Sequence, residues 1–298
     1  MSRFVTVLLF AVVALVWPAA ARASGPALQY ATADSLGVFH VDVDRLRKSP
    51  VFKEVQASML KRPDAKRELD ELKKQLGVDP WKDLSGFTVI LGPTATKNQR
   101  DVVFVLEGKY SEKRVLDFIQ KHDKAAPEAV EGKTGKYYRF DGGRMNIAFR
   151  GKYVLIGGPI ERAMATNDPK AALADVRRPV EKNPVWLAVR TNPDARGQLG
   201  MLGASDLETL ALGIDVSEGA KVHLHGRFSN PSQAANLATE IRGAIDGASK
   251  DKTVQQLGLV ELMKSIEVRD VGPDLDLSLS LDKSQAGALI QTLQGLAH

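Results

Sequence analysis

One unit of the hydrophobic pattern, residues 84–122, organises the chain. Two short apolar runs, 87–91 and 102–106, are rich in the β-branched and aromatic residues that are typical of strands. The loop between them is polar and contains glycine and proline, so the two runs predict a hairpin. Ser111 follows where a helix N-cap is expected, and apolar residues at helical spacing beyond it predict a helix over 111–122.

The same pattern returns once, over residues 206–245, and the two junctions between strand and helix have matching sequences. Each is glycine, a basic residue, an aromatic residue and serine. The glycine allows a bend, the aromatic side chain fills the corner, and the serine caps the helix. A unit that repeats once predicts an internal duplication, because a solenoid needs at least three repeats. The markers of the duplication are Gly108, Tyr110 and Ser111, which we expect to superpose on Gly226, Phe228 and Ser229.

Strand and helix patterns also alternate through the rest of the chain. The strand patterns lie at 36–43, 137–140, 145–149, 153–156, 185–190, 266–269 and 275–281. The helix patterns lie at 51–59, 64–76, 160–165, 195–202, 232–248, 254–263 and 284–296, and the polar segment 123–136 is predicted to be a loop.

Strands that come in hairpins, mixed with helices, favour an α+β fold with antiparallel sheets. We predict two related halves, each a mainly antiparallel sheet covered by helices, that arose by internal duplication. The first half spans 24–166 and the second spans 185–298. Residues 167–184 hold three prolines and four basic residues and are interpreted as the linker.

The first 23 residues have the pattern of a secretory signal. Arg3 precedes a continuous apolar core over 5–17, and Ala21-Arg22-Ala23 fits a cleavage site. The core is short for a membrane span, which needs about 20 residues, so we expect cleavage and treat a retained anchor as the alternative. No later stretch is apolar enough to cross a bilayer. The protein is therefore expected to be exported, to the periplasm or the extracellular space.

Composition narrows the possible chemistry. The chain of 298 residues has 44% hydrophobic and 26% charged residues, as a folded globular protein does. It has no cysteine, which excludes disulfides, thiolate metal sites and cysteine nucleophiles and is typical of bacterial envelope proteins. The net charge of +5 is modest, and an exported chain with this charge is not expected to bind nucleic acid.

Two sets of polar residues could hold a metal ion. His40, Asp42 and Asp44 alternate along one predicted strand, and His223 and His225 alternate along another. In each case we favour a solvated polar strand face, because cationic residues flank the second pair and Asp44 also suits a helix start. No phosphate-binding loop, nucleophile elbow or zinc-protease motif is present, so no cofactor is predicted.

Several segments resemble uncharacterised exported bacterial proteins of unknown function. The resemblance covers mainly residues 34–165 and is carried by the stretches DSLGVFHVDVDRLRKSPVFKEV, GFTVILG, VVFVLEGKYSEKRVLDFI and YVLIGG. It implies export and supplies no catalytic residues.

Together these patterns favour a non-enzymatic binding or scaffolding module of the bacterial envelope. A metal-assisted hydrolase and a carrier of a lipid or another apolar ligand are the alternatives. The partner would be an envelope protein, a polymer or an apolar ligand. The halves should also differ, because Val103 and Val105 take the strand face that Lys221 and His223 take in the second half. We therefore expect both faces of the first sheet to be covered and one face of the second to be open to water.

Overall fold

The computed structural model describes residues 26–95, 101–123, 126–165, 167–193, 196, 205–256 and 258–288. The predicted signal segment lies outside this part of the chain. The first half contains strands β1 (Gly37–Asp42), β2 (Leu84–Leu91), β3 (Val102–Gly108), β4 (Glu128–Gly132), β5 (Gly135–Phe140), β6 (Met145–Arg150) and β7 (Tyr153–Gly157). Its helices are η1 (Pro26–Tyr30), α2 (Val43–Leu46), α3 (Pro50–Lys61), α4 (Pro63–Leu76), α5 (Pro80–Asp83), α6 (Glu112–Asp123), η2 (Asp141–Gly143) and α7 (Ile160–Met164).

The remaining elements lie within or after the predicted linker, residues 167–184. They are α8 (Ala174–Arg177), β8 (Val185–Arg190), β9 (Leu207–Asp215), β10 (Gly219–Phe228), α10 (Pro231–Lys250), α11 (Lys252–Gln256), α12 (Val260–Lys264), β11 (Ile266–Val271) and β12 (Asp274–Asp282). The predicted helix 195–202, apart from residue 196, and the part of helix 284–296 beyond residue 288 lie outside the described residues.

The α+β prediction is confirmed, and two local predictions are wrong. The segment 123–136 was expected to be a loop, but β4 pairs with β5 along five residues and adds a strand at the sheet edge. The single helix expected over 254–263 is two helices, α11 and α12. Gly258 lies between them in the left-handed region, with a φ of 69°, where helices commonly end.

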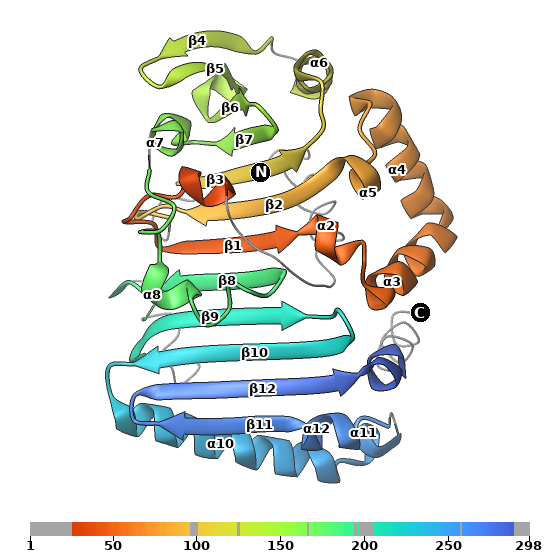
Figure 1. Ribbon diagram of the computed structural model, residues 1–298, viewed down its shortest axis with the longest axis vertical. Coiled ribbons are helices and arrows are strands. Elements are labelled where there is room, and N and C mark those ends of the chain that lie inside the picture. Colours follow the sequence, from red (N-terminus) through yellow and green to blue (C-terminus); the bar gives the residue numbers. More distant parts are fainter. Residues whose placement is uncertain are drawn as a thin grey trace.

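All strands of the described chain belong to one antiparallel sheet (Figure 1). Their order is β11-β12-β10-β9-β8-β1-β2-β3-β7-β6-β5-β4. The two halves meet where β1 pairs with β8. The order β1-β2-β3-β7-β6 in the first half is therefore the same as the order β8-β9-β10-β12-β11 in the second, and β5 and β4 extend the first half.

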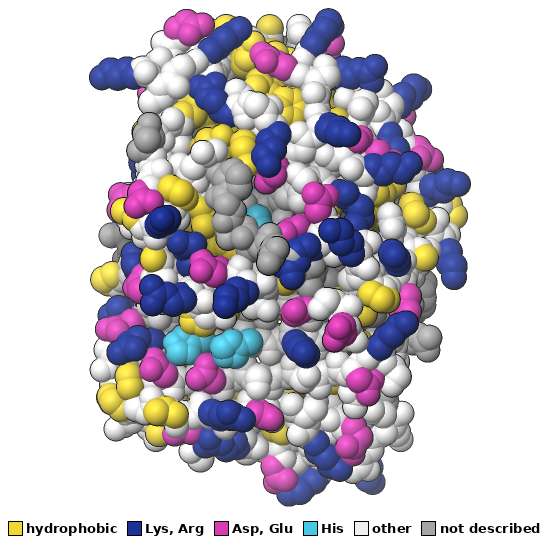
Figure 2. Space-filling model, viewed as in Figure 1, with side chains coloured by type: hydrophobic (Ala, Val, Ile, Leu, Met, Phe, Trp, Pro, Cys, Tyr) yellow, Lys and Arg dark blue, Asp and Glu magenta, His cyan; other side chains and the backbone are white. Residues whose placement is uncertain are grey.

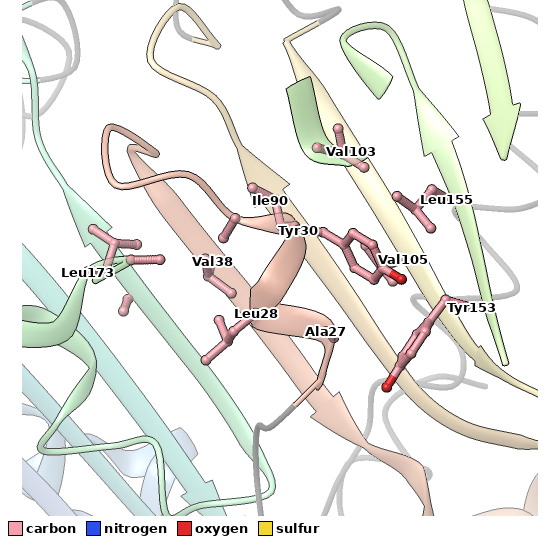
Figure 3. Packing of buried hydrophobic residues seen from close by; sticks show 14 of the residues in the cluster. Ala27, Leu28, Tyr30, Val38, Ile90, Val103, Val105, Tyr153, Leu155 and Leu173 are labelled. Carbon is pink, nitrogen blue, oxygen red and sulfur yellow. The ribbon is translucent and has the colours of Figure 1, made fainter. Parts of the chain in front are cut away.

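The sheet has two faces with different coverings. We call the face over which η1, α7 and α8 lie in Figure 1 the front face. Val105 packs there in the cluster that includes Tyr30 of η1 and Ile160 of α7, and the strand register places His225 on the same face, in line with Ala211 and Ala188 of that cluster. The neighbouring residues Phe104 and Leu224 therefore point to the back face. On the front, η1, α7 and α8 lie over the strands of the first half and over β8. Tyr30 of η1 packs edge-on against Tyr153 of β7, with ring centroids 5.4 Å apart (Figure 3).

The predicted linker is part of this front core. Leu173, Val176 and Val180 are buried among the side chains of the front-face cluster, and the guanidinium of Arg177 donates to the carbonyl of Ala172 at 2.9 Å. Residues 167–184 therefore connect the halves by packing onto the sheet that both halves build.

Helices cover the back face in three places. Phe52 of α3 and Trp81 of α5 pack at the end of the sheet where β1 leads into α2. Ile119 of α6 packs over the strands of the first half, and Ala234 and Ala238 of α10 pack over β10, β11 and β12. No described helix is long and apolar enough to span a bilayer.

Candidate functional site

His40 lies in the front core and is not the exposed strand residue that the alternation predicted. Its side chain is 6% exposed and shares a hydrogen bond of 2.8 Å with the Thr88 hydroxyl. Trp186, directly opposite on β8, holds its ring 5.6 Å from the imidazole. Burial lowers the pKa of His40 to about 4, so the imidazole is neutral at physiological pH. The surroundings of His40 make it a core residue.

Asp42 and Asp44 do not join His40 in a common site. Asp42 caps α2, because its carboxylate accepts from the backbone N–H of Arg45 at 3.0 Å. Asp44 belongs to α2, where it pairs with Arg47 at 2.8 Å and is exposed. The predicted strand thus ends before Asp44, and the cap is Asp42 in place of Asp44. Desolvation raises the pKa of the Asp42 carboxyl.

His223 and His225 lie together on a partly exposed surface. They project from the front face of β10, and each donates to the same oxygen, Oδ1 of Asp276 on β12, at 3.1 and 2.9 Å. The two imidazoles are 38% and 23% exposed. Figure 2 shows a pair of histidine side chains over this part of the sheet, among side chains of both charges.

The side chains on this surface are hydrogen-bonded to one another. In each histidine, the ring nitrogen that faces Asp276 hydrogen-bonds to the same carboxylate oxygen. The guanidinium of Arg227 lies 3.4 Å from the carboxylate of the neighbouring Asp274. Within the described ranges, no three histidine, aspartate or glutamate side chains gather so that they could hold a metal ion. The front of β10 and β12 is a ladder of hydrogen-bonded polar side chains facing water.

The junction markers occupy the same corner of each half, in a register that differs by two residues from the one predicted. Gly108 N donates to the carbonyl of Lys152, in the β6–β7 turn, and Phe228 N donates to the carbonyl of Pro273, in the β11–β12 turn. Each corner also carries a register shift opposite its last residues. Gly108 and Phe228 thus make the matching backbone bonds, which differs by two positions from the predicted pairing of Gly108 with Gly226.

The aromatic marker and the serine marker each have a different role in the two halves. Phe228 is buried under α10, as a corner-filling residue should be. Tyr110 is only partly buried, and its hydroxyl donates to the carbonyl of Gly151 at 2.6 Å. Ser111 directly precedes α6, but Asn230, one residue after Ser229, caps α10 through a bond of 3.0 Å from Ser232 N.

The back face carries a set of residues that the sequence did not single out. Four leucines stand directly opposite one another on four neighbouring strands, and all four are partly exposed. We call them the leucine row: Leu187 on β8, Leu212 on β9, Leu224 on β10 and Leu277 on β12. None of them belongs to the core clusters that the described helices build on this face. Alternation in β12 indicates that Leu277 faces an apolar side, but only strand pairing reveals the row.

The leucine row continues into the first half. Leu187 stands opposite Phe39 of β1, and Phe39 stands opposite Val89 of β2. These two residues are also partly exposed, although both contact the cluster formed with α3 and α5. The result is an apolar line across six strands, and it crosses the junction between the halves.

The comparisons with known proteins leave the function to be argued from these residues. A scan against protein-family models and a search of curated proteins found no match. Among solved structures, crystal form III of TP0453 matches with a TM-score of 0.47 and 9% identity, covering 90% of this chain and 98% of that one. Crystal form I of TP0453 matches with a TM-score of 0.44 and 11% identity, covering 92% of this chain and 98% of that one.

Proposed function

We propose that this protein is an exported, non-enzymatic binding module of the bacterial envelope, and that the back face of its sheet is the binding surface. The observation that carries the proposal is the partial exposure of the leucine row. Apolar side chains in the middle of a large sheet lose favourable burial unless something else covers them. Contiguous apolar surface of this kind marks binding sites in soluble proteins.

The alternative of a metal-assisted hydrolase has less support. Its candidate ligands lie in different surroundings. His40 is a buried, neutral imidazole and Asp42 caps a helix, whereas His223 and His225 belong to the hydrogen-bonded ladder. Elemental analysis of the purified protein separates the two functions. Stoichiometric zinc or calcium would favour the hydrolase.

Native mass spectrometry of the protein purified from an exporting bacterial host tests the binding function. We expect a second mass, from a retained small molecule or partner, that is lost in Leu212→Gln and kept in the front-face control Thr209→Gln. A chain that shows no retained mass and gains none when incubated with the host's envelope extract would contradict the proposal.

Export is part of the same proposal. The apolar core at 5–17 and the site at Ala21-Arg22-Ala23 support cleavage of the first 23 residues. N-terminal sequencing of exported material should therefore begin near Ser24. An intact Met1 in a membrane fraction would indicate an anchor.

We also infer that the two halves arose by internal duplication. The identical strand order of the halves supports this, as do the paired corner bonds from Gly108 and Phe228. The junction strands add a local two-fold relation. The axis passes through the pair of Phe39 and Leu187. A two-fold rotation about it would place the pair of Val38 and Ala188 on the pair of Trp186 and His40. A duplicated half that pairs with its copy through its first strand would produce this register.

A further inference from the structure

We propose that the free edge of β4 pairs with β4 of a second copy of the chain, so that two sheets join around a two-fold axis. The inference concerns an edge of the sheet and is independent of the leucine row. Three observations carry it: the backbone groups that β4 leaves unpaired, the contrast with the other edge of the sheet, and the register in which two copies of β4 fit together.

Two residues of β4 direct their backbone groups away from the sheet. The β6–β7 hairpin turns through two residues, so the pair that closes it, Arg150 with Tyr153, is hydrogen-bonded. Because hydrogen-bonded pairs alternate along each strand, this parity extends through β5 to β4 and leaves the backbone of Ala129 and Glu131 facing outward. The guanidinium of Arg150 on β6 donates to the carbonyl of Lys136 at 3.2 Å, as this parity requires. Among the described residues, none hydrogen-bonds to the backbone of Ala129 or Glu131.

The opposite edge of the sheet, β11, is capped by a side chain. Arg242 of α10 donates to the carbonyl of Val268 at 2.9 Å, and its guanidinium pairs with Asp270 at 2.6 Å. In Figure 1, α10 lies alongside β11 at the bottom of the sheet, whereas β4 is the outermost strand at the top. Charged side chains that cover an edge strand discourage it from pairing with another chain. The two edges therefore differ, and β4 is the one that is free to pair.

The backbone of β4 fits its own copy in one antiparallel register. In that register Ala129 stands opposite the second copy's Glu131, and Glu131 opposite the second copy's Ala129, so every outward N–H and C=O of both strands is paired. The neighbouring register on one side sets Glu131 opposite Pro127, which has no N–H to donate. The neighbouring register on the other side sets Ala129 opposite Lys133, which lies in the turn beyond the strand.

The same register brings compatible side chains together. The two-fold axis passes through Val130, whose side chain lies on the front face and is partly buried against the core there. The two valines would meet and extend that core from one copy to the other. Glu128 stands opposite the second copy's Gly132, and Glu131 stands opposite Ala129, so no two carboxylates face each other directly. Like charges directly opposite one another would have destabilised the pair of strands.

The halves of one chain are already joined in this way. Strands β1 and β8 pair antiparallel around the local two-fold axis through Phe39 and Leu187. A pair of β4 strands would repeat between two chains what β1 and β8 do within one, and the result is one continuous sheet. A contact through a single strand is small, so we expect a weak dimer that forms at high protein concentration.

Disulfide cross-linking of the full chain tests the register, because the sequence has no cysteine of its own. Val130 meets its copy in a pair without backbone hydrogen bonds, where the Cα atoms lie about 4.5 Å apart, within the range of about 4.4 to 6.8 Å that disulfides span. Glu128→Cys is the matched control on the same face of the same strand, since its copy lies about 13 Å away along the strand. Under mild oxidation Val130→Cys should form a covalent dimer at least tenfold faster than Glu128→Cys.

Sedimentation equilibrium of the cysteine-free chain tests the pairing itself. Ala129→Pro removes an outward N–H and no bond to β5, and proline is tolerated on the free side of an edge strand. It should raise the dimer dissociation constant at least tenfold. Ala129→Ser, which keeps the N–H, should leave that constant unchanged. Glu131→Pro repeats the test at the other outward residue and serves if the first proline variant misfolds, which circular dichroism would reveal.

The other outcomes overturn the proposal. Equal cross-linking rates for Val130→Cys and Glu128→Cys would show that β4 does not meet its copy in this register. A chain that stays monomeric at every concentration, or a dimer that both proline variants leave intact, would show that the β4 edge is not an interface. A dimer that Leu212→Gln abolishes and Ala129→Pro preserves would assign self-association to the leucine row instead.

Discussion

Strands β3 and β10 occupy the same place in their halves, and their front faces have opposite characters. In β3, Val103 and Val105 are buried beneath η1 and α7, in the core that Figure 3 shows. In β10, the corresponding positions hold His223 and His225, which face water and bind Asp276. The prediction that the first half is covered on both faces and the second is open on one agrees with this difference. Two halves with the same strand order can thus differ in a covering layer, because only alternate residues need to differ.

The largest expected effect is a contrast between those matched positions. Val105→Asn buries an amide among apolar side chains where a fully buried valine stood, so it should lower the free energy of unfolding by about 3 to 4 kcal/mol. His225→Asn lies on the open face and should change it by less than about 1 kcal/mol. Urea unfolding of both variants measures the contrast. Similar losses at the two positions would mean that the front of β10 is covered as well.

The buried His40 has no titrating counterpart in the second half, where Ala188 takes the matching position on β8. An unfolded histidine titrates near 6.5 and His40 near 4, so the unfolded chain binds the proton first as the pH falls. Stability should therefore begin to fall below pH 6.5, with a loss of roughly 3 kcal/mol from this residue by about pH 4. Urea unfolding at pH 7.5 and pH 4.5 should show a smaller fall for His40→Leu than for wild type. An equal fall would mean that His40 is protonated in the folded protein.

The two junction glycines provide the third contrast, because the sequence pairs them and the structure does not. A Cβ on Gly108 would lie 2.2 Å from the backbone oxygen of Asp83, whereas one on Gly226 would lie 3.2 Å from the flexible end of Leu207. Gly108→Ala should therefore cost about 2 kcal/mol or more, and Gly226→Ala less than about 1 kcal/mol. Thermal unfolding of the two variants checks this. Equal losses would restore the register in which the two glycines superpose.

The sequence predicts the elements of this fold better than their assembly. Alternation and turn residues locate most strands and the α+β class, because these signals depend on neighbours in the chain. They miss β4, whose residues are mostly exposed and therefore lack an apolar alternation. They also place His40 on a solvated face, because polar alternation cannot reveal that a helix from elsewhere covers that face.

The candidate binding surface could not be predicted for a related reason. The leucine row consists of one residue from each of four strands, and its members lie up to 90 positions apart in the sequence, from Leu187 to Leu277. Each leucine alone is an ordinary apolar strand residue. Only the pairing registers align the four, and only the positions of α3 and α10 leave them between two core clusters.

The smallest expected effect tests what the halves share. The β6–β7 and β11–β12 hairpins each turn through two residues, and the first of these is glycine with a φ of 60° at Gly151 and 58° at Gly272. No atom lies within 4 Å of a Cβ built at either glycine, so the cost of alanine comes only from the left-handed backbone. Gly151→Ala and Gly272→Ala should each lower the free energy of unfolding by about 1 kcal/mol, and by the same amount within error. Because neither site differs in packing, urea unfolding of the two variants compares the turns alone. A loss at one glycine without the other would mean that the two hairpins differ in backbone geometry, and the correspondence of the halves would then stop at strand order.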